Sequence, residues 1–274
     1  MLAKAFRNFM IRRTISAKLR NRGMNTFSNH EILVNLRKNS EEKRKEENRP
    51  HEVIYFHKVD DPYSHLTIHF VDKLLSTFDI TLVPILVGEE DSDSVHEPSL
   101  YNKYCLEDAT RIAPFYGIDF SPDSHPRQTL VDLSNAILTA VEPHKFIELA
   151  RTVSKALWQE DENTLKELSK EYNSTESEVS QNLKEGNSIR NEKGYYFGSA
   201  FYYEKELYWG VDRIHHLEDR LIELGVKNDL INEPICAPRL KSPVSFESSK
   251  KVDLHYYPSL NSPYTYVSAK RVRE

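Results

Sequence analysis

Asp61, Pro62, Tyr63 and Ser64 stand together at the predicted start of a helix, where polar side chains can do chemistry. The first N–H groups of a helix lack partners within it, and the helix dipole is positive there. A thiolate would be stabilised at this position, but the turn contains no cysteine. Asp61, which only accepts hydrogen bonds when ionised, is therefore predicted to cap the helix. The alternative is a carboxylate base, with the like charge of Asp60 favouring a bound proton.

Two histidines and two cysteines are the other candidates for chemistry. His65 and His69 are four residues apart on the same predicted helix, a spacing that could hold zinc together with a carboxylate. An exposed helix face explains the pair equally well, and no metal site is predicted. Cys105 and Cys236 are far apart in the sequence, so they form no disulfide framework and fit a reducing compartment. Both are expected to be buried structural thiols, and thiol–disulfide exchange is not expected.

The strands and helices that must position the turn can be predicted from local signals. Apolar runs indicate the strands, Pro62 indicates the start of a helix, and Gly225 indicates the end of one. The predicted elements are a strand at 53–57, a helix at 62–78, a strand at 80–87, a hairpin at 195–204 and 206–209, and a last helix at 211–224. A helix that crosses between two strands implies parallel pairing. This β–α–β and β–β–α order predicts an α/β thioredoxin-like fold with a helical insertion.

The insertion is predicted to be helical apart from an irregular connection at 117–126. Apolar spacing of helical period predicts helices at 100–116, 130–158, 162–172 and 175–186. Thr175 and Glu178 predict a capping box at the start of the last of these helices.

Four segments within residues 52–224 carry a resemblance to a known family. They are 61–64, 116–120, 125–129 and 208–214. All four resemble segments of DsbA-family thioredoxin-fold proteins. Residues 61–64 resemble the Cys-Pro-x-Cys or Ser-Pro-Tyr-Ser turn, and 116–120 resemble a Tyr-Gly-hydrophobic-x-Phe segment. Residues 125–129 resemble a Pro-x-Asn-Thr segment, and 208–214 resemble the aromatic-Trp-Gly-x-Asp-Arg-Leu signature. Within that family the resemblance is to 2-hydroxychromene-2-carboxylate isomerases and kappa-class glutathione transferases. It implies a DsbA-like fold, with glutathione as the cofactor.

The resemblance also implies the roles of individual residues. The catalytic set would be Asp61, Tyr63 and Ser64, and the cofactor-binding set would be Ser199, Ala200, Asp212 and Arg213. Asp61 replaces the family's catalytic Ser or Cys and cannot donate a hydrogen bond to a sulfur. The family's cis-proline is missing from residues 198–201, so a trans peptide is expected there. Asp212 matches the acid that holds the glutathione amino group, although a helix start favours an acid anyway.

The segment 53–66 occurs a second time, without a gap, as residues 254–267. In the second copy, Ser262 restores a neutral hydroxyl at a predicted helix start, followed by Tyr264 and Thr265. The predicted organisation is a basic arm and charged linker at 1–50, a DsbA-like domain at 51–225, a linker at 226–250 and the truncated start of a second repeat at 251–274. The last segment is expected to be a loosely held tail, because it is too short for a core.

Charge is distributed unevenly along the chain. The net charge is -5, yet residues 1–50 contain 13 Lys and Arg against 5 Asp and Glu. The acidic remainder argues against nucleic-acid binding, which requires a basic footprint. Residues 1–22 are compatible with a solvated arm, a basic amphipathic helix on a membrane surface or a mitochondrial presequence. No apolar run is long enough to span a membrane, and a cytoplasmic protein is predicted.

Three functions are compatible with these patterns. The first is a DsbA-like thiol- or glutathione-dependent isomerase that acts on a small thiol or aromatic substrate at Asp61, Tyr63 and Asp212. The second is a degenerate thioredoxin-fold domain that binds or scaffolds without catalysis. The third is an adaptor that reaches a membrane surface through the basic arm.

Overall fold

The structure, a computed structural model, describes residues 18–19, 22–23, 25–26, 29–89, 95, 97–227, 235–236, 255–258, 265 and 268. The chain divides into two compact units. Residues Glu46–Leu240 form one unit, and Met1–Lys45 with Lys241–Glu274 form the other. Every element described below except α3 lies in the Glu46–Leu240 unit.

Helix α3 (His30–Glu46) is stabilised by its own charged side chains. Glu41 pairs with Arg44 at 2.8 Å and with Lys45 at 3.5 Å, which are three and four residues later. Such pairs each stabilise a helix by a few tenths of a kcal/mol. The segment predicted to be a charged linker is therefore helical as far as Glu46. Most of the basic segment at 1–22, and with it the alternative of an amphipathic helix, lies outside the described residues.

In the described part of the chain, four strands form one mixed sheet in the order β2-β1-β3-β4. They are β1 (Glu52–His57), β2 (Thr81–Leu86), β3 (Ala200–Tyr203) and β4 (Glu206–Trp209). β1 pairs with β2 in parallel and with β3 antiparallel, and β3 pairs with β4 antiparallel. A parallel β–α–β unit joined to an antiparallel hairpin in this order is the thioredoxin fold. The predicted fold class and the parallel pairing are confirmed.

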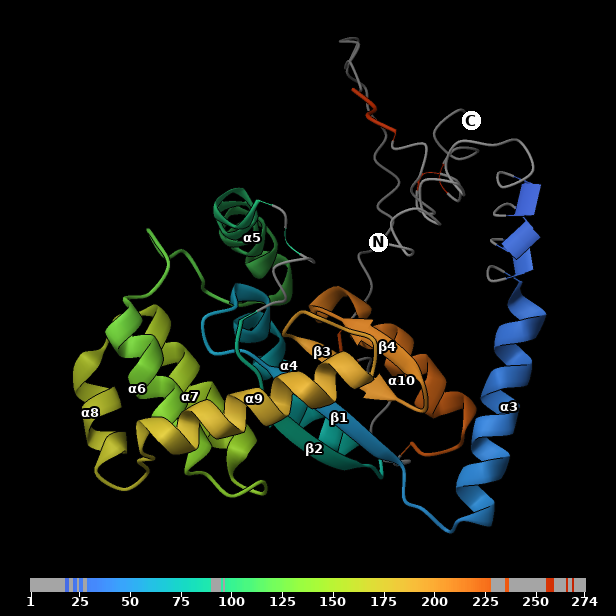
Figure 1. The fold of residues 1–274 in the computed structure, drawn as a ribbon, viewed down its shortest axis with the longest axis horizontal. Coiled ribbons are helices and arrows are strands. Elements are labelled where there is room, and N and C mark those ends of the chain that lie inside the picture. The colour runs from blue at the N-terminus through green and yellow to red at the C-terminus, as the bar shows by residue number, and fades with distance from the viewer. Residues whose placement is uncertain are drawn as a thin grey trace, which may run out of the picture. The chain divides into compact units, whose positions relative to one another are not determined.

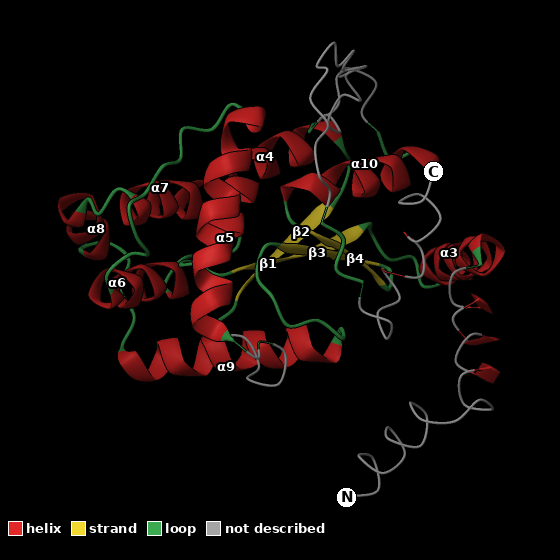
Figure 2. Ribbon diagram, turned by 90° about the horizontal axis from the view of Figure 1, so that it is seen from above, coloured by secondary structure: helices red, strands yellow, loops and turns green. Residues whose placement is uncertain are grey.

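Helices cover both faces of the sheet (Figures 1 and 2). α4 (Pro62–Thr77) and α10 (Ile214–Glu223) lie on one face, and α9 (Glu176–Glu192) crosses the other. Successive side chains of a strand point to opposite faces. Tyr55 accordingly belongs to the main core and Phe56 to a smaller cluster with Ile189 of α9. Because β1 is buried on both faces, its sequence is a continuous apolar run.

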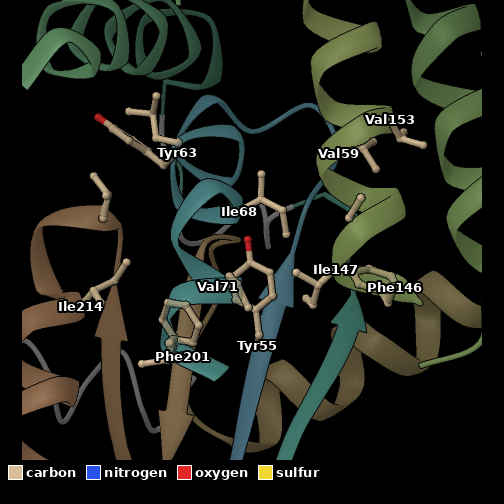
Figure 3. Close-up of a cluster of buried hydrophobic side chains, with 14 of the residues drawn as sticks. Tyr55, Val59, Tyr63, Ile68, Val71, Phe146, Ile147, Val153, Phe201 and Ile214 are labelled. Carbon is tan, nitrogen blue, oxygen red and sulfur yellow. The ribbon is translucent and has the colours of Figure 1, made fainter. Parts of the chain in front are cut away.

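The main core is centred where the sheet meets α4. The rings of Tyr55 and Phe201 stack with their centroids 4.9 Å apart, and both side chains are fully buried. Figure 3 shows them facing Ile68 and Val71 of α4, while Tyr63 lies at the other end of that helix. Burying such a side chain contributes about 1.5–3 kcal/mol. This core therefore fixes the position of α4 and of the turn from which it begins.

The helical insertion between β2 and β3 contains two interruptions that were not predicted. Its elements before α9 are α5 (Pro98–Ile112), the 3₁₀ helix η1 (Ala113–Tyr116), α6 (Gln128–Thr139), α7 (Phe146–Trp158) and α8 (Glu162–Ser169). The single helix predicted at 130–158 is two helices, because the chain turns between Thr139 and Phe146, where Pro143 lacks a backbone donor. The helix predicted at 100–116 becomes 3₁₀ from Ala113, next to Pro114.

Helix α9 continues past Gly186, where the sequence predicts its end. A Cβ at Gly186 would collide with the carbonyl oxygen of Leu86, so the glycine permits a close helix–strand approach and does not end the helix. The predicted capping box of Thr175 and Glu178 is confirmed. Near the other end, the buried Arg190 guanidinium donates to the carbonyls of Gly88 at 3.4 Å and Glu89 at 3.0 Å. These bonds anchor α9 to the chain that leaves β2.

The hairpin and the last helix are shorter than predicted. β3 begins at Ala200, not at Tyr195. Before it, Tyr195 stacks on Tyr196, which meets Phe197 edge-on. Phe197 in turn stacks on Trp209 with centroids 5.2 Å apart. A short 3₁₀ helix, η2 (Val211–Arg213), precedes α10, and Gly225 at φ +71° follows it, as predicted.

None of the described helices combines the length and apolar character needed to span a membrane.

Candidate functional site

Asp61 is the N-cap of α4, as predicted. Its Oδ1 accepts from the backbone N–H of Tyr63 at 3.2 Å. Its Oδ2 accepts from the N–H of Ser64 at 2.9 Å and from the Ser64 hydroxyl at 2.8 Å. Pro62 occupies the first helical position, where a missing N–H costs nothing. The carboxylate is therefore occupied by donors from its own helix, and the alternative role of a catalytic base stays a prediction.

Ser64 is fully buried at the turn. Its hydroxyl oxygen accepts from the backbone N–H of Lys58 at 3.2 Å while the hydroxyl donates to Asp61. The side chain of Lys58 in turn pairs with Asp60 at 3.6 Å. Ser64 therefore joins the end of β1 to the start of α4.

The loop before β3 faces this turn closely. A Cβ at Gly198 would lie 2.8 Å from Lys58 Cβ and 3.1 Å from Ser64 Oγ. Ser199 follows at φ 54°, with its hydroxyl 2.7 Å from that of Thr67 in α4. Every described peptide bond is trans, so the expected trans peptide is confirmed. Ser199, in the left-handed backbone region, thus stands at the place where the resemblance implies a cis-proline.

Ser199 and Ala200, implied to bind a cofactor, are both fully buried. The Ser199 carbonyl accepts from the N–H of Gly210 at 2.8 Å, and Ala200 pairs with Phe56 in the sheet. Their backbone groups hold the hairpin to the sheet, and the cofactor-binding role that the resemblance implies for them stays a prediction.

Helix α5 lies beside the turn. The space between them is only about 30 Å³ and is lined by residues of the turn and of α5, including Asp61, Tyr101 and Cys105. That is room for about one or two waters by the same probe measure. This space has no room for a peptide or a tripeptide thiol, although Asp61 itself is half-buried.

A much larger cleft of about 580 Å³ opens beside the turn, and we call it the Tyr63 cleft. It lies between α4, α5 with η1, the end of β4, and η2 with α10. Its described lining is Tyr63, Tyr104, Asp108, Ile112, Tyr116, Trp209, Gly210, Val211, Asp212, His215 and Cys236. Two predicted site residues, Tyr63 and Asp212, therefore meet in one cleft, whereas Asp61 and Ser64 lie outside its lining.

The polar groups of the Tyr63 cleft include two acids, three phenols and the His215 imidazole. Tyr63 donates to Asp108 Oδ2 at 2.8 Å. Burial raises the pKa of the Tyr63 phenol, and the hydrogen bond to Asp108 raises it further. The Trp209 ring meets Tyr63 edge-on at 5.6 Å between centroids. Asp212 has a side chain 58% exposed and pairs with Arg213 at 3.4 Å. Arg213 itself is not among the residues that line the cleft.

Both cysteines are buried and neither is in a disulfide, as predicted. The Cys236 thiol donates to the Val211 carbonyl at 3.5 Å. Burial, and then the nearby Glu218 carboxylate, raise the pKa of Cys236 to about 12. Glu218 also accepts from the N–H of Ile235 at 3.0 Å, which holds the cysteine's segment against α10. Cys236 is therefore a neutral thiol at physiological pH, unsuited to nucleophilic attack.

The two helical histidines are not on an exposed face. His65 is 5% exposed and its Nδ1 lies 2.8 Å from Ser154 Oγ of α7, so the interpretation as a solvent-facing pair is wrong for His65. α7 packs on the side of α4 that the sequence suggested was open. Among the described residues, no cluster of three His, Cys, Asp or Glu could hold a metal ion.

The sequence did not predict Tyr104 and Asp108 of α5 as site residues. They are four residues apart and therefore share a helix face, but nothing in the sequence shows what that face meets. Ser262 and Tyr264 of the predicted second turn lie outside the described residues, and only Thr265 of that turn is described. The second turn stays a prediction.

No model of a known protein family matches the chain, and no curated protein matches it significantly. Among solved structures, it is similar to selenomethionine-labelled 2-hydroxychromene-2-carboxylate isomerase, with a TM-score of 0.49 and 18% identity. That match covers 64% of this chain and 96% of the other. A likeness of this degree is no evidence of activity. The strand order and directions, with a helical insertion after β2, are those of a DsbA-like thioredoxin fold.

Proposed function

We propose that this domain is a ligand-binding member of the superfamily that includes thiol oxidoreductases and glutathione-dependent isomerases, and that it exchanges no disulfides. Its ligand is a small molecule with an ammonium group beside an apolar or sulfur-bearing part, and glutathione is the first candidate. The Tyr63 cleft is the proposed binding site.

One observation carries the proposal. Next to a turn whose carboxylate accepts three hydrogen bonds from its own helix lies an open cleft that contains Tyr63 and Asp212. A thiol-exchange site needs an accessible thiolate. The turn has none, and both thiols of the chain are buried. Chemistry at Asp61 is therefore less well supported than binding beside it.

The chemistry of the cleft fits a ligand with a cationic end. Asp108 and Asp212 are acids, and the rings of Tyr63, Tyr104 and Trp209 offer apolar faces. An ammonium group pairs with a carboxylate and is attracted to aromatic faces. The amino group of glutathione could pair with Asp212, and its thiol end could lie toward Tyr63.

The two tryptophans make a direct test practical, because only Trp209 lines the Tyr63 cleft. In a Trp158→Phe variant, we expect glutathione and S-methylglutathione to change Trp209 fluorescence saturably at millimolar concentration. N-acetylglutathione, which lacks the ammonium charge, should bind more weakly. No response of Trp209 and no heat of binding to the unmodified protein would exclude glutathione as the ligand.

Two variants test the residue assignment. Asp212→Asn should weaken binding roughly two- to fivefold, the range expected for a solvent-exposed ion pair. Asp219→Asn, an exposed acid of α10 that does not line the cleft, is the matched control and should leave binding unchanged. Insulin reduction by dithiothreitol should run at the same rate with and without the protein. A faster rate that Cys105→Ser abolishes would contradict the absence of disulfide exchange.

A further inference from the structure

One aromatic ring links two walls of the Tyr63 cleft although it does not line the cleft itself. Phe197, in the segment before β3, stacks on the ring of Tyr101 in α5 with centroids 5.3 Å apart and an angle of 14° between the planes. It also stacks on the ring of Trp209 in β4, at 5.2 Å and 21°. Phe197 and Tyr101 are not among the described residues that line the cleft.

The two partners of Phe197 belong to different walls of the cleft. α5 contributes Tyr104 and Asp108 to the lining, and β4 contributes Trp209. Tyr101 precedes Tyr104 by three residues, so its stack with Phe197 lies within one helical turn of the lining. The ring of Phe197 therefore joins the helix that carries Asp108 to the strand that carries Trp209.

Core packing does not account for an aromatic residue at this position. Phe197 is half-buried and belongs to neither of the two hydrophobic clusters of the described chain. Its partner Trp209 is 36% exposed, so the ring of Trp209 is not enclosed by the core either. The rings that restrain Trp209 are Phe197, which stacks on it, and Tyr63, which meets it edge-on at 5.6 Å.

We propose that Phe197 is a positioning residue of the Tyr63 cleft. By stacking on both rings, it fixes the orientation of Trp209 and the place of α5 beside it. The orientation of Trp209 matters for a ligand with an ammonium group, because a cation is attracted to the face of an aromatic ring. The effect on ligand affinity rests on the function proposed above, whereas the effect on Trp209 and α5 can be measured without a ligand.

Trp209 reports the stack directly in a Trp158→Phe background, where it is the only tryptophan. In that background, Phe197→Leu should shift the emission of Trp209 to longer wavelength and increase its quenching by acrylamide. Phe197→Tyr keeps a ring that can stack and should retain the parent emission. Tyr196→Leu is the matched control, because this neighbouring aromatic residue meets Phe197 and Tyr195 and belongs to neither wall. Unchanged emission and quenching in Phe197→Leu would overturn the proposal.

A substitution in the other wall tests the link between the walls. Tyr101→Leu should shift the emission of Trp209 in the same direction as Phe197→Leu does, because Tyr101 acts on Trp209 through Phe197. In the double variant the shift should be no larger than in Phe197→Leu alone, since the two residues form one unit. A double variant whose shift equals the sum of the two single shifts would refute the link. Far-UV circular dichroism of each variant shows that it is folded.

Glutathione then tests the effect on binding, measured by calorimetry in the same background. Phe197→Leu and Tyr101→Leu should each weaken binding by about two- to tenfold, the range expected for the loss of one aromatic pair. Phe197→Tyr should bind as the parent does. Parent affinity in both leucine variants would overturn the proposal. If the parent itself binds no glutathione, the proposed function fails, and the emission of Trp209 still decides whether Phe197 positions the two walls.

Discussion

Gly198→Ala places one methyl group against the candidate turn, and its cost follows from three distances. The new Cβ would lie 2.8 Å from Lys58 Cβ, 3.1 Å from Ser64 Oγ and 3.2 Å from Asp61 Oδ2. Carbon atoms in contact prefer about 3.5–4.0 Å, so the loop and the turn must separate by roughly 0.7 Å or more. Neither contact is easily relieved by a side-chain rotation. Lys58 Cβ is bonded directly to the backbone, and Ser64 and Asp61 are hydrogen-bonded to each other.

Overpacking of this kind costs about 1–3 kcal/mol. Gly198 has no positive φ, so alanine recovers about 0.4–1 kcal/mol by restricting the unfolded chain. We therefore expect a net loss of about 1–2 kcal/mol in the free energy of unfolding. In a domain of this size that lowers Tm by about 2–8 °C.

Urea and thermal unfolding measure this loss, and Gly88→Ala is the matched control. A Cβ at Gly88 would meet nothing closer than 3.5 Å, which is ordinary contact. That variant should be as stable as the parent protein or slightly more stable. If the contact with Lys58 is responsible, Gly198→Ala should cost less in a Lys58→Gly background. Equal stability of the Gly198 and Gly88 variants, or a cost that the Lys58→Gly background leaves unchanged, would refute the reasoning.

Three other predictions concern buried polar groups. Burial lowers the folded-state pKa of His57 and His65 to about 3, so between pH 6.5 and 3 only the unfolded chain takes up these protons. The free energy of unfolding should therefore fall by about 1.4 kcal/mol per pH unit for each ring as the pH decreases. Replacing His57 by Phe should remove about half of the pH dependence that the two rings cause, measured by urea unfolding between pH 7 and 5. Asp61→Ala should lower the free energy of unfolding by about 1–2 kcal/mol, measured with urea. Asp61→Asn should lower it by less than half as much, because asparagine keeps an acceptor for the cap. Equal losses would show that the cap is not the cause. Ellman's reagent should label Cys236 slowly in the native protein. Labelling should be faster in Glu218→Ala, because this variant lacks the acceptor of the Ile235 N–H. An unchanged rate would show that Glu218 does not hold the segment that contains Ile235 and Cys236.

The sequence predicted those parts of the fold that depend on local patterns. The apolar run of β1 and the cap formed by Asp61 before Pro62 are decided by neighbouring residues. Periodicity alone missed the break between α6 and α7, because the apolar spacing continues on both sides of it. Gly186 was misinterpreted as a helix end. A side chain is excluded there by the carbonyl oxygen of Leu86, which lies about a hundred residues earlier in the chain and which the local sequence does not reveal.

The candidate site was only partly accessible to sequence reasoning, for a related reason. Tyr63 and Asp212 could be named because each belongs to a recognisable segment. Their meeting in one cleft with Asp108 depends on the rotation of α5, which long-range packing sets. The burial of His65 likewise depends on α7, to which Ser154 belongs, and an i, i+4 pair of histidines carries no information about that neighbour.

The pairing of β1 with β3 has a consequence for how the chain folds. Ile54 pairs with Tyr202, so the sheet cannot be completed until the ends of a roughly 150-residue segment meet. Closing a flexible loop of that length costs about 4 kcal/mol of chain entropy. The β1–α4–β2 unit and the helices of the insertion can form from contacts closer in sequence. Arg190, by docking α9 at the end of β2, shortens the loop that remains. Joining β3 to β1 is therefore expected to be the slow step, and weakening the Arg190 anchor should retard refolding.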